Sequence, residues 1–86
     1  MDKRALDESA GIINAACRDW FVPIGGGSMA LAAEVKVVEY KWDAGDPMQV
    51  GMKARVQDAW YWLTDGQIAG MVRQSRTLIE IASIAV

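Results

Sequence analysis

The chain has 86 residues, 52% of them hydrophobic, and its eleven acidic and nine basic side chains give a formal net charge of −2. This length leaves room for one small domain, residues 1–86, and the charge balance disfavours generic nucleic-acid binding through a basic surface. No apolar segment approaches the roughly 20 residues that cross a bilayer, and the N-terminal sequence is not that of a signal peptide. We therefore expect a cytoplasmic protein that does not enter a membrane.

The first predicted element is an amphipathic helix from Asp2 to about Phe21. Its apolar residues recur at helical spacing on one side, and its charged residues fall mainly on the other side. Pro23 and the glycine run 25–27 end the helix. The single cysteine, Cys17, lies on the apolar side, so we expect a buried structural thiol rather than a nucleophile.

The glycine run and the serine that follows it, residues 25–28, invite comparison with a phosphate-binding loop. Such a loop follows a strand and opens a helix, and it usually carries a lysine or a defined glycine spacing. This run follows a predicted helix and leads into a predicted strand. We interpret it as a flexible connection.

Residues 29–42 carry charged side chains that would be scattered all round a helix, and alternation of apolar and charged side chains predicts a strand instead. The apolar phase jumps by one residue between Val37 and Val38. A jump of this kind predicts a β-bulge at that point.

Turn-forming residues follow at 43–47, and residues 48–57 then alternate without a break between apolar and polar side chains. This alternation indicates a strand whose even-numbered, apolar residues face a core. We expect an antiparallel hairpin over about 34–57. Residues 58–63 either extend its second strand or form a third strand.

Residues 67–80 separate into a polar and an apolar half of a helical wheel, which predicts a C-terminal amphipathic helix. In the alternative, residues 64–66 form a hairpin turn and the isoleucine-rich segment 77–86 forms a final strand. The last six residues, 81–86, carry no charge, so we expect them to be buried against the chain's own sheet or a neighbouring chain. Two helices covering one face of an antiparallel sheet make an α+β fold.

Candidate catalytic and metal-binding groups are few. The chain has no histidine, which removes the usual catalytic triads and the commonest transition-metal ligand. Asp43 and Asp46 flank a glycine, but a calcium loop that starts at Asp43 needs a glutamate where Ala54 stands. Asp43, Asp46 and Asp58 stay open as paired carboxylates, because nothing in their spacing selects two of them. We expect no metal and no cofactor, and an enzyme activity is disfavoured.

The cluster Trp60-Tyr61-Trp62 is the first candidate binding site. On a strand the two tryptophans share one face and Tyr61 takes the other, and we expect the tryptophans to face the core. Tyr61 would then be exposed in the neighbourhood of Lys53 and Arg55. These residue types are enriched at interface hot spots, which favours a protein partner over a nucleobase.

The leading hypothesis is a small non-enzymatic protein that acts through protein–protein contacts, as a self-assembling subunit, an adaptor or an inhibitor of a larger machine. A compact, single-domain chain of this kind is typical of phage or mobile-element products. The expected partner-binding residues are Trp60, Tyr61, Trp62, Lys53, Arg55, Ile81, Ile84 and Val86. An alternative is a small-molecule-binding protein or minor enzyme with a Trp-lined pocket. A third hypothesis, nucleic-acid binding, is disfavoured and requires six basic residues to converge on one face: Lys36, Lys41, Lys53, Arg55, Arg73 and Arg76.

Overall fold

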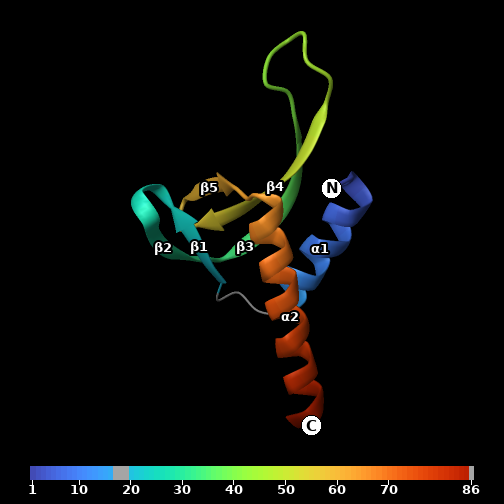
Figure 1. The fold of residues 1–86 in the computed structure, drawn as a ribbon, viewed down its shortest axis with the longest axis vertical. Coiled ribbons are helices and arrows are strands. Elements are labelled where there is room, and N and C mark those ends of the chain that lie inside the picture. The colour runs from blue at the N-terminus through green and yellow to red at the C-terminus, as the bar shows by residue number, and fades with distance from the viewer. Residues whose placement is uncertain (17–19, 86) are drawn as a thin grey trace.

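The computed structural model describes residues 1–16 and 20–85, which form an α+β fold with two antiparallel sheets (Figure 1). In chain order the elements are α1 (Lys3–Ala16), β1 (Trp20–Ile24), the short 3-10 helix η1 (Gly25–Gly27), β2 (Ser28–Ala32), β3 (Glu34–Tyr40), β4 (Gln49–Val56), β5 (Ala59–Trp62) and α2 (Asp65–Ala85). Strands β1 and β2 form one sheet, and β3, β4 and β5 form the other in that order. The predicted fold class is confirmed.

Helix α1 begins directly after Asp2, whose side-chain oxygen accepts a hydrogen bond from the Ala5 amide at 2.8 Å. A carboxylate at this place satisfies one of the unpaired N–H groups of the first turn. The predicted end of the helix, near Phe21, is wrong, because a strand already begins at Trp20. The prediction for Cys17 falls outside the described residues.

The segment around the glycine run forms a β-hairpin, which the sequence pattern did not predict. Trp20 and Val22 are buried and Phe21 between them is exposed, so side chains here alternate with the period of a strand. Gly26 and Gly27 have φ angles of 69° and 81°, a conformation that residues other than glycine rarely adopt. The glycines therefore turn the chain from one strand into the next, not from a helix into a strand.

Strands β3 and β4 pair one residue to one from Glu34 to Tyr40. The predicted bulge between Val37 and Val38 is therefore wrong. The alternation of apolar residues changes phase at Val38 because, at the end of the sheet that holds Tyr40, the outer face is apolar as well as the inner face. Tyr40, which shares the outer face with Val38, packs its ring against Trp62 with centroids 4.4 Å apart.

The predicted alternation along β4 is confirmed. Met52, Ala54 and Val56 are buried in the core. Met48, which was expected to share their face, precedes the strand and is exposed. Gln57 turns the chain with a φ angle of 54°, and β5 then returns as a separate third strand.

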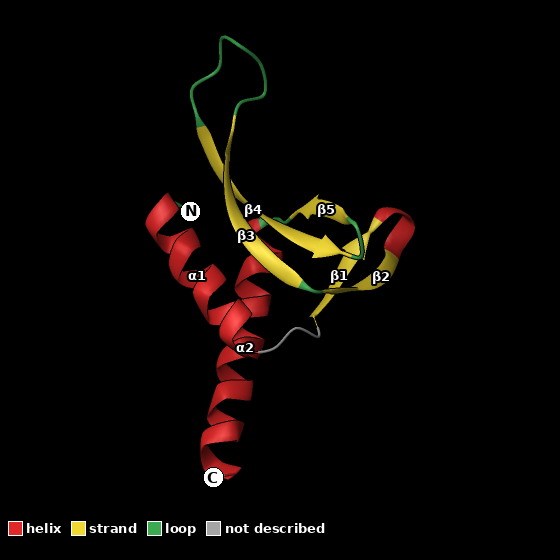
Figure 2. Cartoon of the chain, turned by 180° about the vertical axis from the view of Figure 1, so that it is seen from behind, coloured by secondary structure: helices red, strands yellow, loops and turns green. Residues whose placement is uncertain are grey.

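A single hydrophobic core joins both helices to both sheets. Its buried members are Leu6, Ala10, Ile13, Trp20, Val22, Ala32, Val35, Met52, Ala54, Val56, Leu63, Ile68 and Met71. Helix α1 lies alongside β3 (Figure 2), and its inward side chains meet the inward face of the three-stranded sheet. The core thus uses one face of that sheet, and the other face, here called the outer face, carries half-buried and exposed side chains.

The edge of β3 next to α1 is capped by a side chain. The Asn14 side-chain amide donates to the Val35 carbonyl at 2.9 Å, and the Val35 amide donates to the Asn14 side-chain oxygen at 3.1 Å. Unpaired strand edges invite pairing with other chains. This reciprocal pair of hydrogen bonds satisfies the backbone of β3 near its start and ties α1 to the sheet.

Helix α2 starts with a capping box. The Gln67 amide donates to the Thr64 hydroxyl at 3.1 Å, and the Thr64 amide donates to the Gln67 side-chain oxygen at 2.7 Å. The helix continues to Ala85, so the strand alternative for 77–86 is wrong over the described part of that range. Residues 76–84 are exposed and project from the body (Figure 1), so they are not buried against the chain's own sheet.

The projecting helix makes the molecule elongated. Its principal extents are 52, 30 and 20 Å, and its radius of gyration is 13.9 Å. A compact chain of this length has a radius of gyration of about 12 Å. The tip of the β3–β4 hairpin and the C-terminal end of α2 lie at opposite ends of the long axis (Figure 1).

Candidate functional site

The outer face of the three-stranded sheet carries interleaved rings and cations. Two rows cross the strands: Lys36, Lys53 and Trp62 in one, and Glu34, Arg55 and Trp60 in the other. The Lys36 ammonium lies 4.1 Å from the centroid of the Trp60 ring. The Lys53 ammonium lies 4.5 Å from the centroid of the Trp62 ring. Each lysine therefore covers a tryptophan face with a favourable cation–π contact.

Lys36 and Lys53 stand directly opposite each other in the β3–β4 register. Like charges in this position destabilise a sheet. Within the part of the chain that the structure describes, no carboxylate forms an ion pair with either ammonium. Arg55 differs, because its Nε donates to the Glu34 carboxylate at 2.9 Å. The outer face thus keeps two positive charges for which residues 1–16 and 20–85 supply no counter-ion.

Three rings gather at the end of the outer face nearest the hairpin tip. Tyr40 contacts Trp62 at 4.4 Å and Trp42 edge-on at 5.4 Å between centroids. Gly51 allows the Trp62 ring to lie close to the β4 backbone and to reach Tyr40, because a Cβ at position 51 would lie 2.9 Å from the Trp62 ring. Trp42 remains 73% exposed, which is unusual for the largest apolar side chain.

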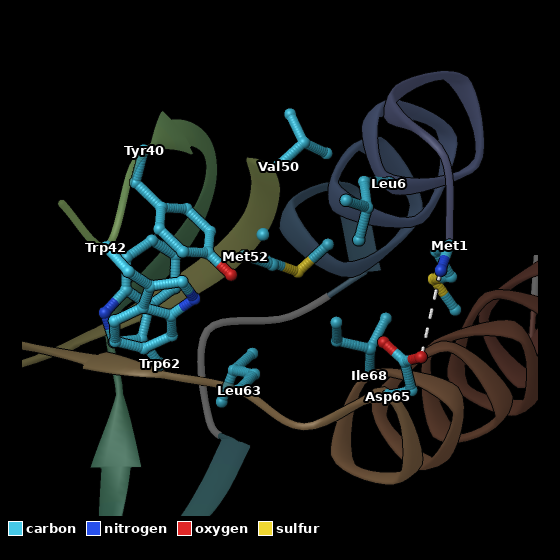
Figure 3. A pocket seen from close by; sticks show the side chains of 11 residues that line it. Met1, Leu6, Tyr40, Trp42, Val50, Met52, Trp62, Leu63, Asp65 and Ile68 are labelled. Atoms are coloured by element: carbon cyan, nitrogen blue, oxygen red, sulfur yellow. Dashed lines mark ion pairs between the residues drawn. The ribbon is translucent and has the colours of Figure 1, made fainter. Parts of the chain in front are cut away.

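A cavity of about 210 Å³ lies behind these rings (Figure 3). Tyr40, Trp42 and Trp62 lie on one side of it, and Leu6 and Ile68 lie on the other. Its polar end is the N-terminal ammonium of Met1, 3.8 Å from the Asp65 carboxylate. Sites for drug-sized ligands measure roughly 300–1,000 Å³. The size of this cavity therefore gives no support to the small-molecule alternative.

The predicted aromatic cluster is oriented the opposite way to expectation. Trp60 and Trp62 lie on the outer face, because they pair with outward residues of β4. Tyr61 pairs with Ala54, which is fully buried, and it packs against the core. The two tryptophans are therefore available to a partner, and Tyr61 serves the core.

The structure brings together one part of the predicted contact set and separates the rest. Lys53 and Arg55 share the outer face with the two tryptophans. Ile81 and Ile84 lie on the projecting end of α2, well away from that face (Figure 1). Val86 lies outside the described residues. The contact set thus divides into two surfaces, the outer face and the helical tail, which we define as residues 76–85.

The basic residues do not meet on one surface. Lys36, Lys53 and Arg55 share the outer face, whereas Arg73 and Arg76 belong to α2. Of the three carboxylate candidates, Asp43 and Asp46 share the hairpin tip and Asp58 lies apart from them. Asp43 shapes the hairpin tip by accepting a hydrogen bond from the Gly45 amide at 3.0 Å, and Asp58 follows the opposite end of β4. In residues 1–16 and 20–85, no group of three or more acidic or cysteine side chains is placed to hold a metal ion.

Sequence reasoning missed Tyr40 and Trp42 as members of the outer surface. The signal was the phase change at Val38, which places Val38, Tyr40 and Trp42 in one alternating series. Two successive apolar phases on one strand also arise when opposite faces become apolar at its two ends. That interpretation would have identified the outer aromatic residues.

Comparison of the chain with protein-family models, curated proteins and solved structures finds no match in any of the three. Among the helices of the described residues, none has the length and apolar character needed to span a bilayer.

Proposed function

We propose that the chain is a non-enzymatic, self-assembling subunit, and that its helical tail packs against the tail of a second copy. One observation carries this proposal: the tail leaves four large apolar side chains uncovered. The exposed fraction is 42% for Leu78 and Ile79, 57% for Ile81 and 84% for Ile84. Contiguous apolar surface of this kind marks an interaction site.

The apolar side chains of the tail continue the stripe that α2 uses in the core. Positions 68, 71, 75, 78 and 82 are separated by three and four residues in turn, which is the spacing of a coiled-coil seam. The first three of these positions, Ile68, Met71 and Ser75, are buried in the chain's own core. Leu78 and Ala82 continue the same seam beyond the body, where they are exposed. A second helix laid along the seam would cover them.

The charge of the tail is compatible with a second copy as the partner. The tail carries only two charged residues, Arg76 and Glu80, and is neutral overall. At helical spacing both lie on the side opposite the seam, so no charge is buried when two tails pack seam to seam. Two copies can therefore use the same surface in the two-fold arrangement that is commonest among homodimers.

The length of the tail sets the size of the contact. The ten residues of the tail extend about 15 Å at the usual rise per residue. Ile81 and Ile84 widen the apolar surface beyond the seam, so more than one neighbouring helix can contribute to the cover. The assembly we propose is a homodimer or a higher oligomer.

The test is sedimentation equilibrium of the chain, of Ile81→Glu and of a control, Ser83→Glu. Ser83 lies on the polar side of the tail with Glu80, so the control adds the same charge away from the apolar surface. We expect Ile81→Glu to lower the average mass and Ser83→Glu to keep it. Equal masses for the chain and Ile81→Glu, with helicity unchanged by circular dichroism, would contradict the proposal.

A further inference from the structure

We infer that the tip of the β3–β4 hairpin of one copy docks on the outer face of a second copy, and that the contact is reciprocal. This inference adds a second interface to the proposed self-assembly. We define the tip as residues 41–48. It rests on complementary charge and on exposed rings that both sides of the contact supply.

The tip combines apolar surface with a net negative charge, because its two carboxylates outnumber its one basic side chain, Lys41. Asp43 and Asp46 supply two carboxylates, and neither forms an ion pair with a basic group of the described residues. Trp42 and Met48 flank them and are 73% and 56% exposed. The Asp46 amide donates to the Asp43 carbonyl at 3.1 Å, so the turn has a defined shape. The tip projects from the body at one end of the molecule (Figure 1).

The outer face presents the matching set. Lys36 and Lys53 are two opposed ammonium groups without a carboxylate, and their repulsion is a cost that the fold of one chain does not offset. Trp60 and Trp62 lie beneath them. Two carboxylates from another copy would compensate both ammonium groups. A contact between the outer faces of two copies would bring lysines together and would be strongly disfavoured. The charges therefore select the tip over another outer face as the contact for the lysine pair.

The spacing allows both copies to dock at once. Asp46 and Lys53 are seven positions apart in the sequence, which corresponds to about 23 Å of extended chain. A two-fold axis that crosses the hairpin midway, near Gln49 and Val50, would place each tip over the lysine pair of the other copy. Such an arrangement is an isologous interface, in which each copy uses the same surface.

The hairpin tip and the end of the helical tail lie at opposite ends of the long axis, so the two contacts use separate parts of the chain (Figure 1). A subunit with two separate two-fold interfaces grows beyond a dimer, into a chain or a closed ring. The hairpin contact is electrostatic and weakens with added salt. The tail contact is apolar and does not share this dependence.

The experiment uses the Ile81→Glu background, in which the tail contact is removed. A tip variant combines Asp43→Asn, which keeps the side-chain acceptor, with Asp46→Lys. A face variant combines Lys36→Glu with Lys53→Glu. We expect each variant alone to associate at least about tenfold more weakly than its background. An equimolar mixture of the two should recover association, because each tip then meets a face of opposite charge.

Asp58→Lys is the matched control, because it makes a charge change of the same sign in the turn at the far end of β4. It should leave association unchanged, and thermal unfolding verifies that every variant folds. A background that stays monomeric, or a mixture that recovers nothing, would overturn the hairpin contact while leaving the tail contact intact. A last outcome concerns nucleic acid. If the background binds a single-stranded oligonucleotide saturably, and the face variant loses this binding while the tip variant keeps it, the outer face is a nucleic-acid site and the hairpin contact is overturned.

Discussion

Replacement of Gly51 by alanine should destabilise the sheet, although the replacement of a glycine by alanine in a strand usually stabilises it. An added Cβ would lie 2.9 Å from the Trp62 ring and 3.3 Å from the Tyr40 ring. Non-bonded carbon atoms normally lie about 3.5–4.0 Å apart, so the Trp62 ring must retreat by at least roughly 0.6 Å. That retreat disturbs the ring contact between Trp62 and Tyr40 and the cation–π contact of Lys53.

The magnitude follows from two opposing effects. Overpacking costs about 1–3 kcal/mol, and the middle of this range applies here, because Trp62 can move toward solvent but its contacts with Tyr40 and Lys53 are disturbed when it does. Removing the conformational freedom of a strand glycine gains about 0.5–1 kcal/mol. The net loss in the free energy of unfolding of Gly51→Ala is then about 1 kcal/mol. For a domain of this size such a loss lowers the melting temperature by about 4–8 °C.

Thermal unfolding followed by circular dichroism measures this change. Gly11→Ala is the matched control: a Cβ at Gly11, in the interior of α1, would meet no atom within 4 Å, so this change should stabilise the chain. In a Trp62→Ala background, Gly51→Ala should become neutral or stabilising. If Gly51→Ala instead raises the melting temperature of the otherwise unchanged chain, the packing of Trp62 across the glycine is wrong.

Three further substitutions test the fold. Met52→Ala should cost about 2–5 kcal/mol in urea denaturation because Met52 is fully buried, whereas Gln49→Ala should change stability by less than about 0.5 kcal/mol; equal effects would refute the assigned faces of β4. Asn14→Ala should cost about 1–3 kcal/mol and speed hydrogen exchange at the Val35 amide, and unchanged exchange there would show that the cap is not needed. Thr64→Ala removes the α2 cap and should cost about 0.5–2 kcal/mol in thermal unfolding; no loss would show that Thr64 does not cap the helix.

The elements with long, regular patterns were predictable from the sequence. Eight residues of β4 alternate without interruption, and only a strand with one buried face explains that pattern. The first half of α2 was predictable for the same reason, because its apolar stripe recurs over several turns. The β1–β2 hairpin was not, because each of its strands has five residues and the apolar spacing around Trp20 also fits the end of a helix.

The orientation of the aromatic residues depends on long-range pairing that local alternation does not contain. Strand β5 has four residues, and both of its faces carry rings, so its pattern does not select an inner face. The pairing of Tyr61 with buried Ala54 decides the matter. The position of the helical tail is likewise a tertiary property, because composition predicts that the tail is apolar but does not place it outside the body.

The most direct test of self-assembly is the mass of the unmodified chain in solution, measured by light scattering over a wide range of concentrations. One chain has a mass of 9.4 kDa. The packing of exposed tails predicts an average mass above this value that rises with concentration, by mass action. A mass of 9.4 kDa at every concentration would contradict the account, because the apolar side chains of the tail would then remain in water.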